Sequence, residues 1–226
     1  MGVKAIAQAL GLVPSTCLHI LRVLVHEQLI RSDANKRYSL GVGLIALART
    51  AIDRNTFAVV AQPALDRLAA QWKVTAIGVE VVALDYLVVV ALARAQVPFS
   101  LHVDVGSRFP ALISATGRLV AAYTDRPWSE LEHGFKKLRW QSAPDIKTWC
   151  AEVEAVRHKG FSVDRGNYIS GITIIAVPLL DASNRLHHAI VAAGMKSQLD
   201  GARCTVLAKQ MQTEARRLST SMFVTR

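Results

Sequence analysis

The sequence has 226 residues, 51% of them hydrophobic and 19% charged, which predicts two folded domains with packed cores and excludes a disordered chain. Its 27 basic and 17 acidic side chains give a formal net charge of +10, which favours polyanionic partners such as DNA, RNA or an anionic membrane. The apolar runs are far shorter than the ~20 residues that cross a bilayer, and no secretory signal opens the chain. We therefore expect no membrane partner. Three scattered cysteines, Cys17, Cys150 and Cys204, argue against a disulfide framework and a zinc site, so we expect reduced thiols and a cytoplasmic protein.

The first forty residues have the pattern of two helices followed by a hairpin. An amphipathic helix is predicted over Val3–Leu10, and Gly11 is the natural residue to end it in a left-handed conformation. A second helix is predicted to start at a Ser15 or Thr16 cap and to run to about residue 28. Two short strands then flank a polar turn, at Leu29–Ser32 and Arg37–Leu40.

Two helices with a tight turn and a basic hairpin form the arrangement that inserts one helix into a DNA major groove. Charge agrees with this, because residues 1–52 carry six basic and two acidic side chains. Hydroxyls at a helix start suit phosphate oxygens, an arginine one turn deeper can read guanine, and a basic hairpin tip can contact the DNA backbone. The predicted DNA contacts are Ser15, Thr16, His19 and Arg22 on the second helix, with Lys36 and Arg37 at the hairpin tip. The alternative is an ordinary solvent-exposed helix face.

The pattern of predicted elements changes near residues 54–57, from two helices and a basic hairpin to a mixture of helices and apolar strands. A helix over Val42–Asp53 connects the two parts, so the predicted division is a winged helix-turn-helix at 1–41, a linker helix at 42–57 and a larger domain at 58–226. In the larger domain the predicted strands are Val74–Leu84, Tyr86–Ala93, Phe99–Val105, Ile172–Leu180 and His187–Gly194. The predicted helices are Ala58–Trp72, Ala115–Tyr123, Ile146–Lys159 and Cys204–Phe223. Strands and helices mixed in this way predict an α+β fold with an antiparallel or mixed sheet covered by helices.

Four segments follow one another in a characteristic order and spacing. They are the helix-turn-helix of residues 5–24, the hairpin end Tyr38–Gly41, the small-residue turn Ser114–Leu119 preceded by Pro110, and Gly160–Asp164 followed by Gly171, Ile175–Pro178 and Asp181. Over nearly its whole length the sequence resembles the IclR family of bacterial transcriptional regulators. The resemblance implies a GAF-like effector domain, homodimers or dimers of dimers, double-stranded operator DNA as a partner, and repression or activation tuned by a small-molecule effector. We expect no cofactor and no metal.

The resemblance also implies an effector pocket. Carried over residue by residue, its positions are Ala115, Thr116, Asp164, Ile174, Val191 and Ala193. Three of these are apolar here, which leaves Thr116, Asp164 and backbone N–H groups as polar anchors. Such a pocket favours an aromatic or medium-sized organic acid over a very small oxo-acid. The alternatives are that the two strand residues only pack the core and that Asp164 caps a turn.

The sequence departs from the family pattern at several points. A helix that usually precedes the helix-turn-helix is not found before Gly2, which leaves open a sensing or oligomerisation module with weakened DNA binding. Gln28 stands where a glycine usually ends the recognition helix, which suggests a strained turn. Asn167 occupies a position that is commonly acidic, and His19 replaces a commoner arginine.

An enzyme is the other alternative. The sequence has no Gly-rich phosphate loop, no GxSxG elbow and no HExxH helix. His187 and His188 are adjacent, so on a strand they point to opposite faces and cannot share one metal. We therefore expect a regulator and not an enzyme.

Overall fold

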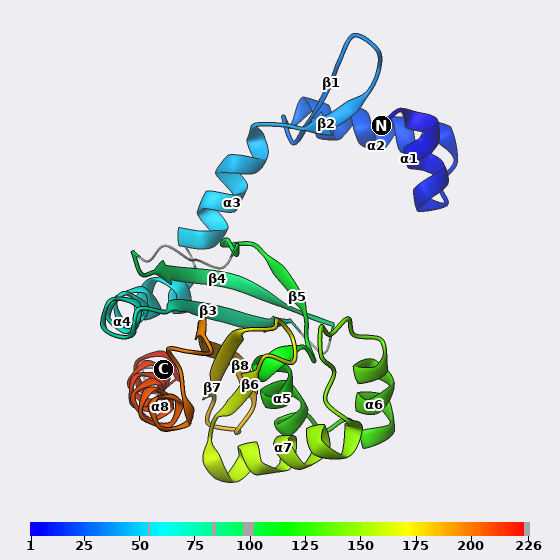
Figure 1. The fold of residues 1–226 in the computed structure, drawn as a ribbon. Helices are drawn as coiled ribbons and strands as arrows, with labels where there is room; N and C mark the ends of the chain where they lie inside the picture. The colour runs from blue at the N-terminus through cyan, green and yellow to red at the C-terminus, as the bar shows by residue number, and fades with distance from the viewer. Residues whose placement is uncertain (54, 83–84, 97–101, 224–226) are drawn as a thin grey trace. The chain divides into compact units, whose positions relative to one another are not determined.

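The chain forms two compact units. A computed structural model describes residues 1–53, 55–82, 85–96 and 102–223, and its backbone contacts divide into Met1–Asn55 and Thr56–Arg226 (Figure 1). The finer division into 1–41, 42–57 and 58–226 stays a prediction.

The first unit contains two helices, a hairpin and a third helix. Its elements are α1 (Val3–Leu10), α2 (Pro14–His26), β1 (Ile30–Ser32), β2 (Tyr38–Leu40) and α3 (Gly43–Asp53). The buried core between α1 and α2 is small and consists of Ala7, Cys17 and Leu21. Gly11 has φ 64° and ends α1, as its lack of a Cβ predicts. The two strands pair antiparallel, so the helix, turn, helix and hairpin follow the order read from the sequence.

The start and the end of α2 differ from expectation. Neither Ser15 nor Thr16 caps the helix, since Val13 is the N-cap and Pro14 occupies the first helical position, where its missing N–H costs nothing. At the other end, Gln28 has φ 58°, a left-handed conformation that costs a residue with a side chain about 1–2 kcal/mol. The strain expected at this position is therefore present.

The second unit is built on one six-stranded sheet. Its strands are β3 (Thr75–Val82), β4 (Tyr86–Arg94), β5 (Arg108–Pro110), β6 (Ser162–Arg165), β7 (Ile172–Leu180) and β8 (Leu186–Met195). They lie in the order β5-β4-β3-β8-β7-β6, and every recorded pairing is antiparallel. The prediction of an α+β fold is confirmed in its antiparallel form.

Helices cover both faces of this sheet (Figure 1). They are α4 (Thr56–Trp72) and α8 (Gly201–Phe223) on one face, and α5 (Ser114–Ala122), α6 (Trp128–Lys136) and α7 (Ile146–Lys159) on the other. The alternation of a strand explains why one segment serves both layers. On β7, Ile174 and Ala176 pack on the α5 side, whereas Ile175 and Val177 pack on the α4 and α8 side.

Several elements were not anticipated. Part of the predicted strand Phe99–Val105 lies outside the described residues, and residues 102–104 are not in a strand. The second neighbour of β4, besides β3, is instead the short β5, whose three residues are too few to show alternation. The helix α6 and the edge strand β6 were also missed. By contrast, α7 ends at Gly160, which has φ 69°, as predicted.

A half-buried histidine on β8 gives an expected dependence of stability on pH. His188 packs against Phe57, with ring centroids 4.3 Å apart. Burial, with a contribution from His187, lowers the pKa of His188 from 6.5 to about 4. The unfolded state therefore binds more protons between these values, so stability present above pH 6.5 falls as the pH drops towards 4.

We expect this proton uptake to lower the free energy of unfolding by at most about 3 kcal/mol, and by less because the ring is partly exposed. Urea unfolding of the wild type and of His188→Phe at pH 7 and pH 4.5 measures it. The variant should lose less stability than the wild type on acidification. Equal losses in both proteins would contradict the assignment.

Candidate functional site

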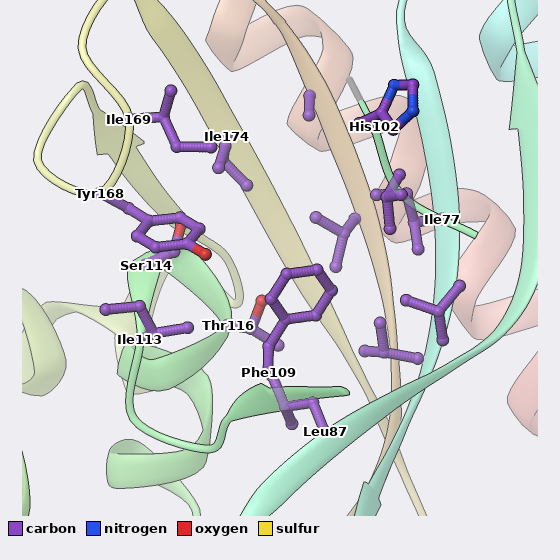
Figure 2. Close-up of a pocket in the computed structure, with 15 residues that line it drawn as sticks. Ile77, Leu87, His102, Phe109, Ile113, Ser114, Thr116, Tyr168, Ile169 and Ile174 are labelled. Carbon is purple, nitrogen blue, oxygen red and sulfur yellow. The ribbon is translucent and has the colours of Figure 1, made fainter. Parts of the chain in front are cut away.

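A cavity lies inside the second unit, between the sheet and the start of α5. Its volume is about 160 Å³ (Figure 2). Strand side chains form most of its wall: Ile77 and Val79 on β3, Leu87 and Val89 on β4, Ile174 on β7, and Val191 and Ala193 on β8. These residues all lie on the α5 face of the sheet, since each belongs to the core on that side. The wall is therefore almost wholly apolar.

The hydroxyl groups of the cavity gather at the start of α5. Figure 2 shows Ser114 and Thr116 on this helix close to Tyr168, with His102 on the opposite side of the view. The first turn of a helix also directs N–H groups without intrahelical partners towards this end. Burial raises the pKa of the Tyr168 phenol, so at neutral pH it keeps its proton and can donate a hydrogen bond.

Ser114 is unusual in two respects. Its φ is 59°, the left-handed region that side chains rarely adopt, at the point where the chain turns into α5. Its Oγ is buried and, within the described ranges, has no hydrogen-bond partner. A buried hydroxyl without a partner costs free energy, so a ligand that bonds to it would recover that cost.

Four of the six predicted pocket residues line this cavity, and two do not. Thr116, Ile174, Val191 and Ala193 are among its walls. Ala115 is fully buried in the core beside it. Asp164 is also fully buried, but its Oδ2 lies 3.5 Å from Nη1 of Arg118 and its Oδ1 accepts backbone hydrogen bonds from the following loop.

Asp164 therefore does not line the cavity: its Oδ1 holds the following loop, and its Oδ2 is paired with Arg118 at 3.5 Å without a hydrogen bond. Sequence reasoning missed the other eleven lining residues, which are Ile77, Val79, Leu87, Val89, His102, Val103, Phe109, Ile113, Ser114, Tyr168 and Ile169. Tyr168 and Ile169 lie in an irregular loop where no periodicity gives direction to a side chain. Ser114 had a signal, since it directly precedes two predicted pocket positions.

The predicted DNA contacts form an exposed group on the first unit. Ser15, Thr16, His19 and Arg22 are exposed on α2, and the spacing of residues 15, 19 and 22 keeps them on one side of the helix. Lys36 and Arg37 are exposed at the hairpin turn. Asp33 Oδ1 accepts hydrogen bonds from the backbone N–H groups of Asn35 and Arg37, at 2.9 and 2.8 Å, so this tip has a defined shape.

Comparison with known proteins decides the family. The sequence profile described as the bacterial transcriptional regulator IclR C-terminal domain matches residues 49–220, more than half of the chain. The chain belongs to the IclR family. The proteins of this family are transcriptional regulators and not enzymes.

Two curated IclR relatives are regulators of catabolic genes. The Pca regulon regulatory protein of Pseudomonas putida is 28% identical over 173 residues, which cover 75% of this chain and 58% of that protein. The p-hydroxybenzoate hydroxylase transcriptional activator of Acinetobacter baylyi is 31% identical over 136 residues, which cover 54% of this chain and 48% of that protein. The chain thus spans about half the length of these relatives.

A solved structure extends the IclR likeness to the whole chain. The IclR transcriptional regulator from Alicyclobacillus acidocaldarius is 29% identical, with a TM-score of 0.79, and the match covers 97% of this chain and 89% of that one. The match includes the first unit, which lies mostly outside the family profile.

The described part of the IclR chain has neither a cluster of metal ligands nor a single helix that could cross a membrane. No three His, Cys, Asp or Glu side chains there lie close enough together to hold a metal ion. No single helix there is long and apolar enough to cross a membrane, and only α1 and α2 counted together, with a bend of 110° between them, reach that length and composition.

Proposed function

We propose that this chain is a transcriptional regulator that binds operator DNA through its first unit and responds to a small aromatic acid in the cavity of its second unit. The proposal is carried by the cavity, which has an apolar wall and a cluster of hydroxyl groups at one end. The same IclR chain has two helices and a hairpin in its first unit.

The size of the cavity supports a ligand with one ring. Its volume of about 160 Å³ is close to the roughly 150 Å³ of an apolar cavity that holds benzene. Ser114, Thr116 and Tyr168 at the α5 start can donate hydrogen bonds to a carboxylate, and the positive end of the helix dipole favours that charge. A very small oxo-acid would leave most of the apolar wall without contacts. The name of the Acinetobacter baylyi relative refers to an aromatic acid hydroxylase, which agrees with this ligand class.

The exposed polar face of α2 supports DNA binding by major-groove insertion. In this proposal Ser15 and Thr16 contact phosphates, His19 and Arg22 reach base edges, and Lys36 and Arg37 contact the neighbouring backbone. Ile45 and Leu47 on α3 are 67% and 57% exposed, which supports pairing of two copies along this helix into a dimer or a dimer of dimers.

The test is fluorescence anisotropy with labelled DNA from upstream of the gene, at two salt concentrations, with random DNA for comparison. We expect at least ~10³-fold preference for the upstream DNA and a steep loss of affinity with salt. Arg22→Ala should weaken specific binding about 5- to 150-fold, because one arginine contact to a base is lost. Arg185→Ala, an exposed arginine at the turn between β7 and β8 in the second unit, is the control and should change binding little.

Benzoate and 4-hydroxybenzoate should then shift the DNA affinity, whereas glyoxylate and pyruvate should not. Equal weak binding to both DNAs would contradict regulation by this chain and favour a sensing or oligomerisation module. A response to glyoxylate or pyruvate alone would contradict the ligand class and leave DNA binding intact.

A further inference from the structure

A group of charged side chains around a buried arginine lies beside the cavity without lining it. At its centre is Arg118 on α5, which is 1% exposed. Its Nε donates a hydrogen bond of 2.7 Å to Glu152 Oε2 on α7, and its Nη1 lies 3.5 Å from Asp164 Oδ2 on β6. A buried charge is stable only when it is paired and hydrogen-bonded, so these contacts hold the guanidinium in one orientation.

The same guanidinium contacts both segments that form the polar end of the cavity. Nη1 of Arg118 donates a hydrogen bond of 2.9 Å to the carbonyl oxygen of Ser114, the first residue of α5. Nη2 donates one of 3.2 Å to Asn167 Oδ1, directly before Tyr168. Ser114 and Tyr168 line the cavity, and the planar fork of Arg118 connects them from behind.

The segment that carries Tyr168 is a short loop, residues 166–171, here called the Tyr168 loop. Glycines with φ 94° and 79° stand at its two ends, Gly166 and Gly171, where the chain must reverse. Asp164 Oδ1 accepts hydrogen bonds from the N–H groups of Gly166, Asn167 and Tyr168, at 3.0, 2.9 and 3.3 Å. Arg118 contacts the other oxygen of the same carboxylate, so it orients the group that holds the loop.

A second contact fixes the loop from outside. The N–H of Ser142 donates a hydrogen bond of 2.9 Å to the carbonyl oxygen of Asn167, and Asn167 Nδ2 donates one of 3.1 Å back to the carbonyl oxygen of Ser142. Asn167 therefore lies between Arg118 on one side and Ser142 on the other. Its side chain links the loop to the buried charges.

We propose that Arg118 is a positioning residue of the cavity. Through its contacts with Ser114, Asp164 and Asn167, it holds the Tyr168 loop against the start of α5. The affinity for the effector then depends on a side chain that does not touch the effector. This inference rests on the proposed function. Lysine is a poor substitute, because a single ammonium cannot make the forked contacts of a guanidinium.

Hydrogen exchange of the full chain tests the placement of the loop without any ligand. In Arg118→Met the amides of residues 166–168 should exchange at least 10-fold faster, while those of β8 stay as in the wild type. Arg118→Lys should accelerate the same amides, by less. The matched control is Arg157→Met, which removes a 2.7 Å hydrogen bond to the carbonyl of Ala122 at the opposite end of α5. It should leave the Tyr168 loop unchanged.

Asn167→Ala covers the case in which Arg118→Met does not fold. It leaves Arg118, Glu152 and Asp164 paired and removes both side-chain hydrogen bonds of Asn167, to Arg118 and to Ser142, so the loop amides should again exchange faster. Asn167→Asp keeps the acceptor for Arg118 and loses only the donor to Ser142, so it should accelerate the loop amides less. The proposal is overturned if the loop amides keep wild-type exchange in Asn167→Ala and in the Arg118 variants that fold. It is also overturned if they accelerate only in step with β8, because Arg118 would then stabilise the domain as a whole.

Calorimetric titration with benzoate tests the consequence for binding. We expect the Kd to rise at least 10-fold in Arg118→Met and Asn167→Ala and to stay within twofold in Arg157→Met. Unchanged benzoate affinity despite a released loop would overturn the dependence on Arg118. If the wild type binds no benzoate, the proposed ligand class fails, and exchange of the loop amides still decides whether Arg118 positions the loop.

Discussion

Gly117→Ala is expected to destabilise the second unit by about 4 kcal/mol or more, which lowers its melting temperature by roughly 10 °C or more. Gly117 is buried on α5, and a Cβ at this position would overlap the backbone carbonyl group of Leu112. A backbone group cannot rotate away as a side-chain end can, so α5 would have to move away from the turn that precedes it. Thermal unfolding followed by circular dichroism measures the effect.

Gly201→Ala is the matched control for this experiment. Gly201 begins α8, and no atom lies within 4 Å of a Cβ built there. Because alanine is the better helix former, this variant should be neutral or slightly more stable, by up to ~1 kcal/mol. Melting of Gly117→Ala within about 3 °C of the wild type would show that the turn before α5 is not as tightly packed as described.

Ala193→Phe is expected to abolish the response to aromatic acids, with at least a 100-fold rise in the Kd for benzoate. Ala193 lines the cavity from β8, and a phenyl ring there would occupy the space of about 160 Å³ that one ring fills. The added ring can cost about 1–3 kcal/mol through overpacking, which the domain should tolerate. Calorimetric titration with benzoate checks the loss of binding.

Met195→Phe supplies the control on the same strand. Met195 is two residues further along β8, is 37% exposed and does not line the cavity, so this variant should keep the wild-type Kd. DNA binding in the absence of benzoate should be unchanged in both variants. If Ala193→Phe still binds benzoate as the wild type does, the aromatic acid does not occupy this cavity.

The pocket positions implied by the family resemblance line the cavity at Thr116 and at three strand residues, and lie beside it at Ala115 and Asp164. Ile174, Val191 and Ala193 line the cavity because a strand gives each residue a fixed side, so a family position carries its direction with it. Asp164 is the third residue of the edge strand β6. Its Oδ1 accepts hydrogen bonds from the loop amides and its Oδ2 is paired with Arg118.

The local sequence by itself determined most of the elements. Periodicity and turn residues predicted the helices α1 and α7 and the strands β3, β4, β7 and β8. Each of these helices has a hydrophobic pattern longer than one turn, and each of these strands is long enough for several alternations. The end of α1 at Gly11 and of α7 at Gly160 followed from the left-handed conformation that glycine adopts without cost.

Only the tertiary structure decided how the Tyr168 loop reaches the polar end of the cavity. Tyr168 reaches it because Asp164, Arg118 and Ser142 fold its loop back over α5, and these partners are far apart in the sequence. The short strands β5 and β6 form because a neighbouring strand offers them backbone partners, a contact that three or four residues do not encode. Local patterns therefore determined the long strands and every helix except α6, while long-range hydrogen bonds and a buried charge determined the polar end of the site.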